Sequence, residues 1–89
     1  MLIGTVSGSL WATRKNEKLN GLKFLLVDIE ADEKTSTPQT LVAADNAGAG
    51  FGDMVLVTMG GSARVALDDP ETPVDAVIVG IIDSVERQN

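Results

Sequence analysis

The chain alternates between short hydrophobic runs and polar or glycine-rich connections, a pattern typical of a protein built from β-strands. In the first run, Leu2, Val6 and Leu10 share one face with glycines, while most residues of the other face are polar. Hydrophobic runs of this kind predict strands over residues 2–13, 22–30, 40–45, 54–59 and 74–85.

One short helix is expected between the last two strands. Ser62 is expected to cap the N-terminus of a helix over residues 63–67, and residues 68–70 are expected to end it. Strands with one brief helix predict an all-β fold, a small five-stranded OB-like β-barrel. An OB-fold usually carries its helix between the third and fourth strands, whereas here it is expected between the fourth and fifth. The term OB-like therefore describes the architecture only.

Three of the predicted strands, the second, fourth and fifth, are hydrophobic on both faces. In the fifth, Val77 and Val79 lie on one face, and Ala76 and Ile78 lie on the other. Only one face of a strand can point into a small barrel. The outer face must therefore be covered, in part by the short helix and otherwise by a partner subunit.

Composition narrows the possible functions. The 89 residues fit one domain, residues 1–89, and include no cysteine or histidine, so disulfides and the commonest zinc ligand and general base are missing. A net charge of −6 and three aromatic residues, Trp11, Phe24 and Phe51, argue against nucleic acid as a partner. No run is long enough for a membrane span, and no secretory signal is evident, so a cytoplasmic protein is expected.

Glycines stand at every second position in Gly48-Ala49-Gly50-Phe51-Gly52, just before Asp53. They predict backbone that either turns through positive φ or closely approaches another backbone. A phosphate-binding loop would need Lys and Ser or Thr directly afterwards. Here Asp53 and a strand follow, so nucleotide binding is disfavoured.

Other polar residues also favour structural roles over chemistry. Asp45, Asp53, Asp75 and Asp83 lie near strand ends, where carboxylates accept hydrogen bonds from turn N–H groups. Arg64 is expected to pair with a carboxylate of this or a neighbouring chain. No catalytic residue, cofactor or metal site is expected. Trp11, on an otherwise polar face, fits an interface anchor and a chance packing position equally well.

The order and spacing of several segments, which together span nearly the whole chain, resemble the EutN/CcmL family, the vertex proteins of bacterial microcompartment shells. The segments include Gly4-Thr5-Val6, Ala12-Thr13-Arg14-Lys15, Gly21-Leu22-Lys23-Phe24-Leu25-Leu26-Val27, Val42-Ala43 with Asp45, Gly48-Ala49-Gly50 with Gly52-Asp53, Val55-Leu56-Val57, Gly61-Ser62-Ala63-Arg64 and Pro73-Val74-Asp75-Ala76, with Ile78-Val79-Gly80-Ile81-Ile82-Asp83.

The resemblance implies a structural protein rather than an enzyme. Members form five-stranded barrels that assemble as homopentamers and cap five-fold vertices of shells such as carboxysomes, whose faces are tiled by hexameric proteins. The chain departs from the family in Gly60-Gly61-Ser62, which has glycine where a small hydroxyl residue is common, and in its short C-terminal tail. The alternative is an OB-like binding module for single-stranded nucleic acid or a small nucleotide ligand. The candidates for the subunit interface or central pore are Gly48, Ala49, Gly50, Gly52, Gly61, Ser62, Ala63, Arg64 and Asp75.

Overall fold

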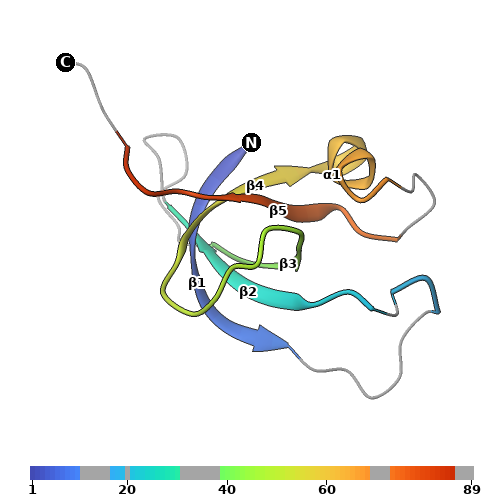
Figure 1. The fold of residues 1–89 in the computed structure, drawn as a ribbon, viewed down its shortest axis with the longest axis horizontal. Coiled ribbons are helices and arrows are strands. Elements are labelled where there is room, and N and C mark those ends of the chain that lie inside the picture. The colour runs from blue at the N-terminus through green and yellow to red at the C-terminus, as the bar shows by residue number, and fades with distance from the viewer. Residues whose placement is uncertain (11–16, 20, 31–38, 69–72, 86–89) are drawn as a thin grey trace.

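The chain folds into a closed barrel of five strands, shown by a computed structural model that describes residues 1–10, 17–19, 21–30, 39–68 and 73–85. The strands follow one another around the barrel in the order β1-β2-β3-β5-β4 (Figure 1). This confirms the predicted all-β barrel with one α-helix before the last strand. The elements are β1 (Leu2–Leu10), the 3-10 helix η1 (Glu17–Leu19), β2 (Phe24–Ile29), β3 (Gln39–Asp45), β4 (Met54–Met59), α1 (Gly60–Ala66) and β5 (Ala76–Ile81).

Strand β1 closes the barrel because it pairs with two neighbours. Its first half lies antiparallel to β4, and most of its length lies antiparallel to β2, with a register shift between Val6 and Gly8. A bulge of this kind bends a strand sharply. Gly4 is a buried residue of β1, and a Cβ there would lie 2.5 Å from Cγ1 of Val27 and 2.8 Å from the carbonyl oxygen of Asp28. Only glycine allows this close approach.

The barrel interior is filled by aliphatic side chains from all five strands. The largest fully buried ones in the interior are Val6, Val27, Val55, Val57 and Ile78. Val77 belongs to a second cluster outside the barrel wall, where Ala44, Ala63 and Val74 are also buried. Helix α1 contributes Ala63 to this cluster, so it covers part of the outer face of β3 and β5. The expected role of the helix as a partial cover is confirmed.

The start of the helix differs from the sequence prediction. Ser62 does not cap it, because α1 already begins at Gly60 and has no side-chain cap. Met59 is still extended, and Gly60 has a φ of 63°. This left-handed residue turns the chain directly from β4 into the helix, and its N–H bonds to the carbonyl oxygen of Asp75 at 2.8 Å. The helix ends near Asp68 as expected.

Strand boundaries are otherwise close to those predicted, and β4 matches fully. The last strand is shorter than expected, since it is confined to Ala76–Ile81. The predicted end of the first strand, with Trp11, lies outside the described residues, as do Asp69 and Pro70.

Candidate functional site

The glycine-rich connection between β3 and β4 is held by the carboxylate of Asp45, whose side chain is only 4% exposed. Its Oδ1 accepts hydrogen bonds from the N–H groups of Ala47 at 3.0 Å and Ala49 at 3.2 Å. Nζ of Lys23 lies 4.0 Å from Oδ2 and donates to the carbonyl oxygen of Ala49 at 3.1 Å. The expected turn role of this aspartate is confirmed.

The tip of the same connection is a second hydrogen-bonded turn. The N–H of Gly50 donates to Oδ2 of Asp53 at 2.8 Å, and the N–H of Asp53 donates to the carbonyl oxygen of Gly50 at 3.0 Å. Two further backbone bonds, both 2.9 Å, attach Gly52 and Asp53 to Val6 of β1. The tip is therefore fixed to the barrel, and it presents Phe51, 83% exposed, to its surroundings.

The glycines of this connection differ in their backbone conformation. Gly48 and Gly52 have φ angles of 77° and 87°, as predicted. Gly50 has no positive φ, and a Cβ there would meet only Oδ2 of Asp53, at 3.9 Å. The expectation of strain or crowding at Gly50 is thus wrong within the subunit, because space is open beside it.

The second group of candidate residues surrounds the start of α1. Gly60 is bonded to Asp75, and Nη1 of Arg64 donates to the carbonyl oxygen of Val74 at 3.4 Å. The bond shown for Arg64 thus goes to a carbonyl group of its own chain, and the expected pairing with a carboxylate of a neighbouring chain stays a prediction. Gly61 and Ser62 are exposed.

The candidate residues fall into two separate places. Asp75 and the segment 60–64 lie together, whereas the tip at Gly50–Asp53 precedes β4 and the helix follows it. A six-residue strand separates the two groups by about 20 Å, and Figure 1 shows them at opposite ends of β4. Ala49 and Ala63 are almost wholly buried, so their side chains belong to the subunit's own core.

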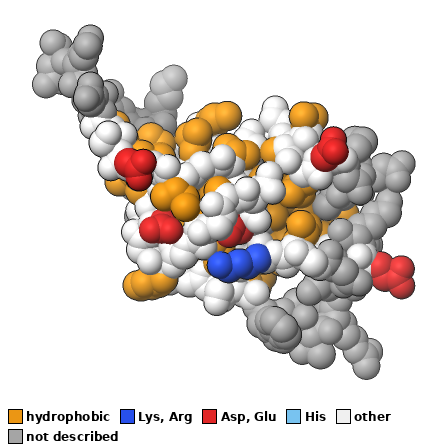
Figure 2. Space-filling model, in the orientation of Figure 1, with side chains coloured by type: hydrophobic (Ala, Val, Ile, Leu, Met, Phe, Trp, Pro, Cys, Tyr) orange, Lys and Arg blue, Asp and Glu red, His pale blue; other side chains and the backbone are white. Residues whose placement is uncertain are grey.

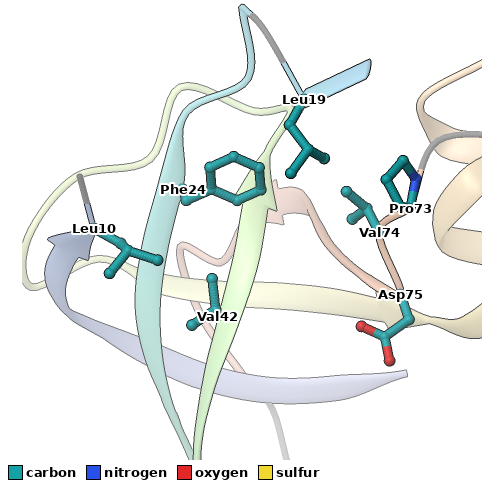
Figure 3. Close-up of a pocket in the computed structure, with 7 residues that line it drawn as sticks. All are labelled: Leu10, Leu19, Phe24, Val42, Pro73, Val74 and Asp75. Carbon is teal, nitrogen blue, oxygen red and sulfur yellow. The ribbon is translucent and has the colours of Figure 1, made fainter. Parts of the chain in front are cut away.

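An apolar groove of about 280 Å³ lies on the outside of the barrel, next to the helix-start group (Figure 3). Leu10, Phe24 and Val42 form its floor on three adjacent strands. Sequence analysis did not locate this groove, although the two-faced hydrophobic pattern of the second strand was its signal. The complete lining is Leu10, Leu19, Phe24, Val42, Pro73, Val74 and Asp75.

Within the described residues, no group of His, Cys, Asp or Glu side chains could hold a metal ion, and no helix is long and apolar enough to cross a membrane. Figure 2 shows a face on which hydrophobic side chains reach the surface over a broad area and the acidic side chains are scattered. An exposed apolar surface of this kind is typical of a contact surface.

Comparison with known proteins agrees with this picture. The family model described as "Ethanolamine utilisation protein EutN/carboxysome" matches residues 1–83. The carboxysome shell vertex protein CcmL of Thermosynechococcus vestitus is 39% identical over 89 residues, which is 100% of this chain and 90% of that protein.

Solved structures show the same fold. The structure of CcmL from Gloeobacter violaceus has a TM-score of 0.86 and 42% identity, and the match covers 100% of this chain and 92% of that one. The GrpN pentameric microcompartment shell protein from Rhodospirillum rubrum has a TM-score of 0.82 and 41% identity, with 99% and 100% covered. The chain therefore belongs to the EutN/CcmL family of bacterial microcompartment shell vertex proteins.

Proposed function

We propose that residues 1–89 form one vertex domain that assembles as a homopentamer and caps the five-fold corners of a bacterial microcompartment shell, with a structural rather than an enzymatic role. The observation that carries this proposal is the match, over nearly the full length of both chains, to a protein described as a pentameric shell protein. The exposed apolar side chains on the barrel wall support it, because a subunit that works alone rarely leaves such a surface open.

The proposed location is the shell of a microcompartment in the cytoplasm, where the pentamer would contact hexameric shell proteins. A flat hexagonal layer cannot close on itself, so a closed shell needs five-fold units at its corners. The alternative of a nucleic-acid or nucleotide-binding barrel finds no support in the relatives described above, which are named as shell proteins.

The two groups of candidate residues would serve different contacts. About 20 Å separates the tip at Gly50–Asp53 from the segment at Gly61–Arg64, so the two groups do not form one compact contact. We assign one group to the axis and the other to contacts further out. Single cysteines at Ser62 and Phe51 distinguish them, since the chain has no other cysteine. Oxidation should link neighbouring subunits only through the cysteine at the axis.

Native mass spectrometry of the purified protein tests the pentamer. The expected mass is about five times that of the 9.3 kDa chain. A dominant monomer or dimer at micromolar concentration would contradict the proposal. The vertex role is tested by deleting all vertex homologues in the host. Electron microscopy should then show elongated or unclosed shells, while the enclosed enzymes remain active in lysates. Closed shells together with a lost enzyme activity would contradict a structural role.

A further inference from the structure

The outer face of β1, β2 and β3 is apolar where the groove lies. Leu10 is paired with Phe24, and Leu26 is paired with Val42, so the four side chains lie beside one another on the outer wall. Leu10 is 45% exposed and Val42 is 47% exposed. Leu19 of η1 and the segment before β5, residues 73–75, border the groove but leave it open. This surface, defined by Leu10, Phe24, Leu26 and Val42, is the groove face.

A second apolar surface lies on another side of the barrel. Ile3 of β1 and Leu56 of β4 are paired, and both are half-buried. They point outward, because their strand neighbours Gly4, Val55 and Val57 are buried in the interior. On its other side Leu56 is paired with Gly80 of β5, which has no side chain to cover it. This surface, Ile3 with Leu56, is the β1–β4 face.

We infer that the groove face of one subunit receives the β1–β4 face of the next copy of the chain, and that this contact, repeated around the five-fold axis, closes the ring. The inference rests on the proposed homopentamer and names the surfaces that build it. A five-membered ring requires a heterologous contact, in which two different surfaces of the subunit meet. The chain offers two such surfaces, the hollow groove face and the β1–β4 face, on different sides of one barrel.

The occupant is a second copy because related chains with the same fold are pentameric. The pentameric GrpN structure covers 99% of this chain at 41% identity. In a ring of this kind, each subunit buries part of its apolar outer wall against a neighbouring subunit. A partner of a different kind would have to displace that neighbour to bind the same wall.

The groove face ends at a polar cluster on the same wall, which supplies a matched control. Oδ1 of Asp28 accepts hydrogen bonds from Oγ1 of Thr40 at 2.8 Å and Oγ of Ser7 at 3.2 Å. Thr40 and Val42 are two residues apart on β3, and both are exposed. A lysine introduced at either position adds the same charge to the same face of the same strand.

The first experiment compares Val42→Lys with Thr40→Lys by native mass spectrometry and circular dichroism. Val42→Lys should lose the pentamer and give monomers at micromolar concentration while the barrel spectrum is kept, since an exposed residue tolerates lysine in the isolated subunit. Thr40→Lys should remain pentameric. If both variants stay pentameric, or both dissociate, the groove face is not the specific contact and the inference is overturned.

The second experiment joins the two faces covalently and does not depend on the lysine variants folding. The double variant Ile3→Cys/Val42→Cys is oxidised and analysed on a non-reducing gel. Within one subunit β2 lies between the two strands, and Val42 and Ile3 are also offset along them. They are therefore more than about 15 Å apart, too far for a disulfide.

Bonds between subunits should produce a ladder that ends at five chains, whereas either single-cysteine variant can give no product beyond a dimer. A wild-type pentamer whose double variant gives no ladder overturns the inference and leaves the proposed function intact. A wild-type protein that is not pentameric contradicts the proposed function itself.

Discussion

Replacing Asp45 with alanine should destabilise the fold through lost hydrogen bonds rather than a lost ion pair. The carboxylate is 4% exposed and accepts two backbone hydrogen bonds, from Ala47 and Ala49. A hydrogen bond to a charged group contributes about 1.5–3 kcal/mol, and a buried N–H left without a partner costs a similar amount. Ala47 is half-buried, so water can satisfy its N–H in the variant. We therefore expect a loss of about 3 kcal/mol in the free energy of unfolding.

The ion pair contributes much less. Lys23 is 59% exposed and its Nζ is 4.0 Å from the carboxylate, so Lys23→Met should cost below about 1 kcal/mol, including the bond to the Ala49 carbonyl group. Asp45→Asn keeps an acceptor oxygen without the charge and should cost about half as much as Asp45→Ala, because charge-assisted bonds are about twice as strong.

Urea titrations at one fixed protomer concentration measure all three variants, since assembly makes the apparent stability depend on concentration. For a domain of this size the midpoint of thermal unfolding should fall by roughly 12–24 °C in Asp45→Ala. The reasoning fails if Lys23→Met is as damaging as Asp45→Ala, or if Asp45→Ala shifts the midpoint by only a few degrees.

Four further substitutions separate the roles of individual residues. Gly4→Ala should cost more than about 2 kcal/mol, because the new Cβ would meet the wall of the barrel at Val27, and urea titration would show an unchanged midpoint if this contact were unimportant. Gly52→Ala should cost about 1–2 kcal/mol because its φ is 87°. Phe51→Ser should change the unfolding free energy by less than about 0.5 kcal/mol, since the ring is almost fully exposed. Gly50→Val should keep the circular dichroism spectrum of the barrel but weaken pentamer assembly, and unchanged sedimentation would remove Gly50 from the interface.

Local patterns in the sequence were sufficient to predict where the strands lie. They did not predict the residue at which the helix begins. β4 was predicted to the residue because Met54–Met59 is a hydrophobic run between a glycine-rich turn and a pair of glycines. The helix start was misplaced because Ser62 carries the side chain of a typical cap. The turn is instead made by a left-handed Gly60 bonded to Asp75, a contact between residues far apart in sequence. A pattern of neighbouring residues contains no information about such a partner.

In the candidate site too, contacts between residues close in sequence were predictable, and contacts between distant residues were not. The hydrogen bonds that the carboxylates of Asp45 and Asp53 accept from N–H groups of their own turns were predictable, because these partners are two to four residues away. The groove was not, because its floor joins three strands whose register depends on the closure of the barrel. For Gly50, the sequence correctly indicated a loop but could not show that its Cβ position is open.

The closed barrel limits how copies of this chain can hold one another. In an open sheet, an edge strand could extend the hydrogen-bonded ladder into a neighbouring subunit. Here each strand is paired on both sides along at least part of its length, although β3 and β5 meet at only two positions. Most backbone groups in the described strands are thus already used within the subunit. Association must then come chiefly from side chains on the outer wall, which explains why strands such as β2 and β4 carry hydrophobic residues on the face that a solitary barrel would make polar.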